Sequence, residues 1–179
     1  MTDQLSAKDW LDQGLKALAA RGFTALKAEP LAKALGVSRG SFYWHFADIG
    51  AFHAAILAHW RDVAVEQIIT DVEAVSPDRN ALPALLHRAF GSKPAVVEGA
   101  MRSWAAHEPK ARAAVQAVDQ RRLGYLESQF RAAGLSPEAA RARAQILYWA
   151  FLGFAMSDKP LPRARRAALL DELLRMTLR

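Results

Sequence analysis

Apolar residues recur at three- and four-residue spacings along almost the whole chain, and this periodicity constrains the fold more than any other feature of the sequence. Such spacing gathers apolar side chains on one face of an α-helix, whereas a half-buried strand would show strict alternation. Alanine, leucine and arginine, which favour helices, dominate the chain, and β-branched residues are few. The sequence therefore predicts an all-α fold.

Capping residues and helix breakers divide the chain into nine expected helices. Ser6 is expected to cap the first helix and Gly22 to end it. Pro30 fits only in the first turn of the second helix, and Ser136 followed by Pro137 marks a later helix start. The expected helices cover about residues 7–21, 28–35, 38–46, 48–75, 81–90, 95–106, 110–133, 137–156 and 163–178.

The composition is typical of a globular protein with a substantial core, since 52% of the 179 residues are hydrophobic and 23% are charged. There is no cysteine, which excludes a disulfide framework, a thiolate metal site and a thiol nucleophile. The N-terminal residues show no secretory signal, and the longest uncharged apolar run, Ile146–Met156, is 11 residues long. A membrane span needs about 20. We therefore expect a soluble, cytoplasmic protein with no membrane partner.

The net charge of +6 and the isoelectric point of about 10.0 suggest a polyanionic partner. The positive excess lies in the C-terminal half, however, because residues 1–60 hold six Lys/Arg against five Asp/Glu. Charge alone therefore does not locate a nucleic-acid site near the N-terminus.

The stretch Leu35–Phe46, LGVSRGSFYWHF, concentrates aromatic side chains in its last five residues. Packing in the core, a ligand cage, a metal or catalytic centre and a contact surface are all possible uses of such a cluster. On a helical wheel Phe42 and Phe46 share one face, while Tyr43 and Trp44 lie on the sides or opposite. The phenylalanines are therefore expected in the core, which leaves Tyr43, Trp44 and the neighbouring histidine as either a packed helix end or a contact surface.

A short helix, a glycine turn and a second short helix form the helix-turn-helix arrangement, here at about residues 28–46. The second helix of this motif enters the DNA major groove with its N-terminus first. Arg39 suits guanine O6 and N7, and Ser41 is an adaptable donor or acceptor. Tyr43 and His45 can donate to phosphates, which positions the protein without reading sequence. Gly40 would let another surface approach the backbone closely.

GVSRGSFYWHF, preceded by LAKAL and followed by a helix beginning ADIGAFHAAI, resembles the DNA-binding segment of TetR-type transcriptional regulators. The resemblance is strong over about residues 6–60, and beyond them MRSWAAHEPKARAAV and SPEAARARAQILYWAFLGF are similar to the helical ligand-binding and dimerisation domains of that family. It implies base or groove contact for Arg39, Gly40 and Ser41. The complete set of expected DNA-binding residues is Lys27, Ser38, Arg39, Gly40, Ser41, Tyr43, Trp44 and His45.

Three positions depart from the family pattern. Family members usually have a phosphate-binding lysine directly after the motif, where this chain has Ile49 followed by Gly50. Glu29 would repel a phosphate if it faced DNA. These departures predict fewer phosphate contacts and a shallower salt dependence than in a strongly basic DNA-binding protein. They also leave an alternative open, a helical small-molecule-binding protein with weakened or lost DNA binding.

Enzymatic and metal-dependent functions find no support in the residue spacing. His53 and His59 are six apart, on different sides of a helix, and His87 and His107 lack any HExxH or carboxylate context. No Ser-His-Asp or paired-carboxylate signature is present either. We therefore expect no catalytic residues, no metal ligands and no cofactor.

Aromatic and methionine side chains in the C-terminal two thirds could line an apolar effector pocket, although for each one taken alone a place in the core is favoured. The candidates are Trp60, Phe90, Met101, Trp104, His107, Tyr125 and Trp149. In a protein that resembles the TetR type, the effector would bind between the fourth helix and those covering about residues 81–133.

The two last helices are expected to form a dimer interface, two from each subunit. AQILYWAFLGFAM is apolar almost all round, and Ala150 and Gly153 would allow close helix approach. The expected interface residues are Ile146, Ala150, Gly153, Phe154, Leu170, Leu173 and Leu174.

Together these features predict a homodimeric, ligand-responsive DNA-binding regulator. The expected domains are a DNA-binding head over residues 4–64 and an effector-binding and dimerisation domain over residues 65–179. The resemblance implies a repressor that binds a palindromic operator on double-stranded DNA and is released by a small, largely apolar effector.

Overall fold

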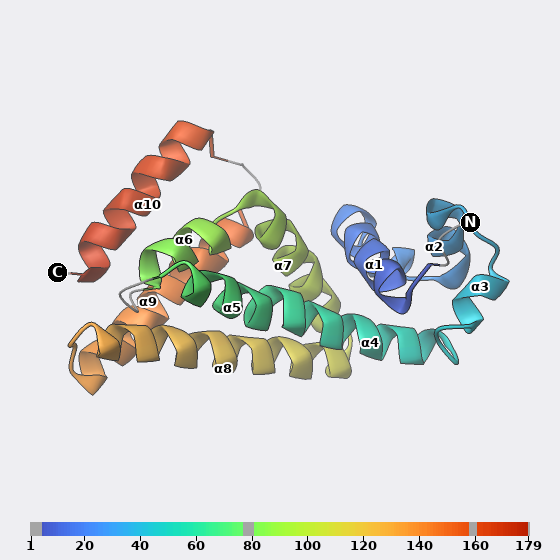
Figure 1. Ribbon diagram of the computed structural model, residues 1–179, viewed down its shortest axis with the longest axis horizontal. Coiled ribbons are helices and arrows are strands. Elements are labelled where there is room, and N and C mark those ends of the chain that lie inside the picture. The colour runs from blue at the N-terminus through green and yellow to red at the C-terminus, as the bar shows by residue number, and fades with distance from the viewer. Residues whose placement is uncertain (1–4, 77–80, 158–160, 179) are drawn as a thin grey trace. The chain divides into compact units, whose positions relative to one another are not determined.

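A computed structural model of the protein describes residues 5–76, 81–157 and 161–178, and these residues form helices and connecting turns without any strand (Figure 1). The all-α prediction is therefore confirmed for the described part of the chain. The α-helices are α1 (Ala7–Arg21), α2 (Ala28–Leu35), α3 (Gly40–Tyr43), α4 (Ile49–Arg61), α5 (Gln67–Ala74), α6 (Leu82–Ala89), α7 (Ser92–Ala105), α8 (Pro109–Ala132), α9 (Pro137–Ala155) and α10 (Arg163–Leu178).

Side-chain caps begin the helices where the sequence predicted them. The Ser6 hydroxyl accepts the Asp9 backbone N–H, and the Asp9 carboxylate in turn accepts the Ser6 backbone N–H, which completes a capping box at α1. Asp48 caps α4 through the Ala51 N–H, and Ser136 caps α9 ahead of a proline in the first turn. One start differs, because α7 begins at Ser92 rather than after Pro94. A proline is tolerated in the first turn, where its missing N–H costs no helical bond.

The third helix is shorter than expected. It covers Gly40–Tyr43, with Arg39 at the N-cap position and no capping bond from Ser38. The predicted continuation to Phe46 consists of turns, held by N–H donation from His45 and Phe46 to the Phe42 carbonyl. Two turns of helix gain too few hydrogen bonds to offset nucleation, so tertiary packing decides how much of the segment is helical.

The expected long helix over residues 48–75 is divided by a π-helical segment, η2 (Asp62–Glu66), between α4 and α5. Buried side chains follow each other at four-residue steps through Phe52, Ile56 and Trp60, and the next buried one is Val65, five residues on. In a regular α-helix, a side chain five residues further on would point away from the core. The wider π turn accommodates this five-residue step. The sequence pattern predicted a continuous helix here and gave no indication of a π turn.

The chain forms two compact units, and the division between them falls inside η2. The first unit contains residues 1–63 and 96–115, and the second contains residues 64–95 and 116–179. One junction between the units lies between residues 63 and 64, and the segment 96–115 belongs to the same unit as residues 1–63. The assignment of functions to residues 4–64 and 65–179 stays a prediction. Among the described helices, none is both long and apolar enough to cross a bilayer.

Candidate nucleic-acid interface

The turn between α2 and α3 depends on Gly36. Its backbone is left-handed, with φ 72° and ψ 26°, and its N–H donates to α2 carbonyls. The next N–H, of Val37, donates to the Ala32 carbonyl at 3.0 Å. Glycine adopts this conformation without the steric penalty of a Cβ atom, so the chain can leave α2 and start α3 within a few residues.

Buried aromatic rings anchor α3 to the rest of the first unit. Phe42 is fully buried and Phe46 is 7% exposed, as predicted. The Phe42 ring meets Trp10 of α1 edge-on at 5.4 Å between centroids and Phe52 of α4 at 5.3 Å. Edge-to-face pairs of this kind stabilise beyond their buried area. A helix of four residues is thereby held in one orientation.

The opposite side of α3 is open to solvent. Trp44 is 83% exposed and Tyr43 is 49% exposed, the proportions expected of side chains that meet another surface. Lys27, Ser38, Arg39 and Gly40 are exposed, and Ser41 and His45 are half-buried. Every residue predicted to contact DNA is thus at least partly accessible on or beside the helix-turn-helix, while its role in binding stays a prediction.

Arg39 and Tyr43 interact on this surface. The Arg39 Nη2 donates to the Tyr43 hydroxyl at 3.2 Å, and the guanidinium lies 5.9 Å from the centre of the tyrosine ring. This hydrogen bond is the first cause of a raised pKa at Arg39, and the Glu29 carboxylate contributes to the same rise. A guanidinium and a phenol therefore lie in contact on the exposed surface.

The start of α4 carries Ile49 at the position where the resemblance described above leads us to expect a phosphate-binding lysine. Ile49 is 40% exposed there, and the Asp48 carboxylate accepts the Ala51 N–H at 2.7 Å. Directly after the motif, this chain therefore has an apolar side chain and a carboxylate that is already hydrogen-bonded, where a positively charged side chain was expected. This end of the surface therefore offers less attraction to phosphate.

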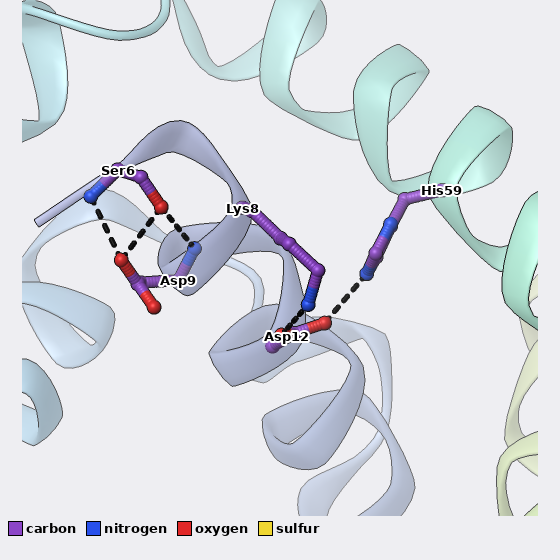
Figure 2. A network of polar contacts seen from close by, with 5 residues as sticks. All are labelled: Ser6, Lys8, Asp9, Asp12 and His59. Atoms are coloured by element: carbon purple, nitrogen blue, oxygen red, sulfur yellow. Dashed lines mark hydrogen bonds and ion pairs between the residues drawn. The ribbon is translucent and has the colours of Figure 1, made fainter.

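A polar network joins α1 to α4 in the same unit (Figure 2). Asp12 of α1 accepts from the Lys8 ammonium and from His59 Nε2 of α4, both at 2.6 Å. Burial alone would raise the pKa of the Asp12 carboxyl, but the hydrogen bonds and charges of Lys8 and His59 outweigh it and lower that pKa. The network is a second link between the helices on either side of the motif.

Close packing supplies a further link between α1 and α4. A Cβ atom built on Gly14 would lie 2.4 Å from Ile56 Cδ1 and 2.9 Å from the tip of the Phe52 ring. Gly14 therefore lets the two helices approach at a point where any side chain would collide with the core.

The second unit contains a mostly apolar cavity. Its free volume is about 60 Å³. Of the seven residues predicted to line an effector pocket, Phe90 and Tyr125 do so. Trp60, Met101 and Trp104 are buried in the first unit, and His107 and Trp149 are exposed. The cavity is lined by Ala64, Val65, Ile68, Ile69, Leu85, Leu86, Ala89, Phe90, Arg122, Tyr125, Leu126, Leu147, Tyr148 and Phe151.

Three polar side chains in this lining have distinct environments. Arg122 donates to the Ala64 carbonyl at 3.3 Å and lies over the Phe151 ring, and the Tyr148 hydroxyl donates to Asp119 at 2.6 Å. The Tyr125 hydroxyl is buried. Burial first, and then the nearby charge of Glu73, raises the pKa of Tyr125 to about 12.

Sequence reasoning missed Arg122 and Tyr148 as cavity residues. Arg122 has the appearance of a solvated arginine on a charged helix, and only the tertiary structure brings it onto the Phe151 ring. No local signal in the sequence distinguishes such an arginine from its exposed neighbours.

The predicted dimer residues divide into exposed and internal ones. Ile146 and Gly153 lie exposed on α9, where Trp149 and Met156 extend the same stripe with 64% and 55% exposure. Ala150, Phe154, Leu173 and Leu174 are half-buried and pack against the core of the second unit, and Leu170 is buried in it. The exposed stripe follows three- and four-residue steps, so it forms one face of α9.

Comparison with known proteins places the motif in a family. Residues 11–56 match the family described as "Bacterial regulatory proteins, tetR family". Over these residues the chain is similar to that family. The resemblance expected from the sequence is thereby confirmed. The match begins within α1 and ends within α4, and it includes the whole helix-turn-helix.

Solved structures share the fold over nearly the whole chain. A transcriptional regulator from Rhodococcus sp. Rha1 has 21% identity and a TM-score of 0.76, with 97% of this chain and 94% of that chain covered. A TetR-family member from Streptomyces coelicolor A3 has 19% identity and a TM-score of 0.62, with 93% and 96% covered. The regulator FadR from Bacillus subtilis, solved with stearoyl-CoA, has 15% identity and a TM-score of 0.71, with 97% and 98% covered. No curated protein matches significantly.

Proposed function

We propose that this protein is a ligand-responsive DNA-binding transcriptional regulator, a repressor that binds a palindromic operator as a homodimer. The observation that carries the proposal is the division of side chains over residues 39–46, on and beside α3. Phe42 and Phe46 are buried, whereas Arg39, Tyr43 and Trp44 are exposed on a short helix behind a glycine turn. The match of this segment to the tetR family supports the same role.

The exposed groups suit double-stranded DNA. The Arg39 guanidinium can make two hydrogen bonds to guanine O6 and N7, and Ser41 can donate to or accept from a base edge. Tyr43, Lys27 and His45 supply donors for phosphates, and the flat Trp44 ring offers apolar contact to the sugars of the DNA backbone. A short α3 that begins at Gly40 fits the width of the major groove.

The cavity of the second unit is the candidate effector site. Its walls are mostly apolar and carry a few polar groups, the pattern usual for small-molecule sites. The structurally similar FadR of Bacillus subtilis binds stearoyl-CoA, which supports an effector site in this fold. Since little of the interior is free, a bound effector would have to move the lining side chains apart, and we propose that this movement releases the operator.

The exposed stripe on α9 is the candidate dimer surface, together with the adjoining face of α10. Ile146 and Trp149 leave apolar area in contact with water, and Gly153 adds no bulk between them. A second copy of the same surface would cover this area by an isologous contact. A dimer would present two α3 helices to half-sites about one helical turn apart. No residue in this proposal carries out catalysis.

Selection of bound duplexes from a random library tests the DNA-binding role directly. We expect recovery of a palindromic sequence that the wild type binds at least about 1,000-fold more tightly than unrelated DNA. Arg39→Ala should relax discrimination at one base pair of each half-site, and Trp44→Ala should weaken binding on every sequence. Arg141→Ala, outside the head, is the matched control for the loss of one positive charge.

The alternative of a small-molecule-binding protein with lost DNA affinity is favoured by Ile49 and by the small net charge of residues 1–60. Failure to enrich any sequence, while small molecules still shift thermal stability, would favour that alternative. If DNA binding is present, Ile49→Lys should increase affinity on all sequences and steepen the salt dependence by about one unit.

A further inference from the structure

Arg39 and Tyr43 form a pair one helical turn apart on the exposed face of α3. Their side chains share a hydrogen bond of 3.2 Å, and the guanidinium lies toward the tyrosine ring, 5.9 Å from its centre. Both residues are exposed, so their polar groups are accessible to another molecule. An unrestrained arginine on a surface would sample many rotamers and would have to lose them on binding.

The tyrosine ring is itself held by the core. It meets the Phe42 ring edge-on, with 5.3 Å between centroids and an interplanar angle of 83°. Phe42 is fully buried against Trp10 and Phe52. Packing against Phe42 therefore restricts the Tyr43 ring. The hydrogen bond to the Tyr43 hydroxyl in turn restricts the guanidinium of Arg39.

We propose that Tyr43 is a positioning residue for Arg39, whose guanidinium it holds in the orientation that reads a guanine. This inference rests on the proposed DNA-binding function and adds a basis for its specificity. The Tyr43 oxygen accepts one N–H and leaves four further donors on Arg39, enough for the two bonds to guanine O6 and N7. The phenol O–H remains free to donate to a phosphate.

A paired arrangement of this kind predicts coupling that independent contacts would not show. If Tyr43 only bound a phosphate, its hydroxyl would contribute the same factor on every sequence, with or without Arg39. If it also holds Arg39, loss of the hydroxyl weakens discrimination at the base pair that Arg39 reads, and only while Arg39 is present. A double-mutant cycle separates the two contributions.

The test uses wild type, Arg39→Ala, Tyr43→Phe and the double variant of the full chain. Each is titrated by fluorescence anisotropy against the selected operator and against operators with one base pair changed. Tyr43→Phe keeps the ring that packs on Phe42, and circular dichroism with thermal unfolding checks that the fold is unchanged. Arg21→Ala, an exposed arginine at the end of α1, is the control that should leave discrimination unchanged at every base pair.

We expect wild type to discriminate at the base pair read by Arg39 by at least about fivefold, and Arg39→Ala to abolish this preference. Tyr43→Phe should reduce the preference at the same base pair by at least about threefold and leave the other positions unchanged, because the coupling of neighbouring contacts is of this order. In the Arg39→Ala background, Tyr43→Phe should weaken binding only by a sequence-independent factor.

Two results would overturn the inference while leaving the DNA-binding function intact. One is an unchanged preference in Tyr43→Phe, and the other is an Arg39→Ala variant that keeps full discrimination at every position. A wild type that selects no sequence would instead contradict the proposed function itself, so the two failures are distinguishable.

Discussion

In the first unit, the Asp12 side chain both links α1 to α4 and has a shifted pKa. Its carboxylate accepts from Lys8 and from His59, and these contacts lower its pKa below the ordinary value of 3.8. Because the folded-state pKa lies below the unfolded one, the ionised carboxylate stabilises the folded state. This contribution is present above pH 3.8 and is lost as the pH falls through the lower, folded-state pKa.

We therefore expect Asp12→Asn to lower the free energy of unfolding at pH 6, and the difference from wild type to shrink toward pH 3. Urea denaturation at both pH values measures the difference. Lys8→Met removes one of the two hydrogen-bond donors to Asp12. The difference in free energy of unfolding between this variant and wild type should therefore change less with pH than the difference for Asp12→Asn. A difference between wild type and Asp12→Asn that stays equal at both pH values would argue against the stabilised carboxylate.

Sequence patterns predicted some of these residue roles and not others. The spacing of Phe42 and Phe46 predicted that both are buried, because a helix places residues four apart on one face. The same pattern could not predict that His59 bonds to Asp12, 47 residues away. Contacts between distant positions depend on how helices are packed, and a single sequence carries no local signal of that packing.

At the scale of single elements, the conformation of Gly36 sets the angle between α2 and α3. A left-handed residue other than glycine is strained by about 1–2 kcal/mol. Gly36→Ala should therefore lower the free energy of unfolding by about 1 kcal/mol or more, and Gly36→Asn by less, because asparagine tolerates this conformation better. The space around Gly36 is open, so the cost reflects backbone strain alone. Equal stability of the alanine variant and wild type would contradict it.

The contact of α1 with α4 gives a second prediction for the elements. Gly14→Leu should destabilise the protein by about 1–3 kcal/mol, because the added side chain collides with Ile56 and Phe52. Gly124→Leu in α8 is the matched control, since nothing lies within 4 Å of its Cβ position. The control should be neutral or stabilising, because leucine favours helices over glycine. Thermal or urea unfolding measures both variants.

The periodicity of apolar residues did not predict the π-helical segment between α4 and α5. Helical spacing predicted one continuous run over residues 48–75, and the described backbone is helical throughout Ile49–Ala74. The five-residue step between Trp60 and Val65 is visible in the sequence only once burial shows which residues face the core.

At the scale of the whole molecule, the exposed stripe of α9 predicts self-association. Trp149→Glu should convert the protein to monomers in sedimentation velocity, because a charge replaces an apolar side chain that is 64% exposed within one chain. The fold should be retained, since Trp149 contributes little to the core. Ala117→Glu, exposed on α8, is the control that should leave the association state unchanged. Equal sedimentation of wild type and Trp149→Glu would place the dimer surface elsewhere.

The sequence by itself determined the helical class, the positions of most caps and the division of α3 into buried and exposed faces, because these depend on interactions within about one helical turn. It also carried the TetR-type motif, whose residues are consecutive. Only the tertiary structure decided that Trp60, Met101 and Trp104 fill the first unit while Arg122 and Tyr148 line the cavity of the second. Buried aromatic residues on different helices look alike in a sequence, since their neighbours come from distant segments and are chosen by packing.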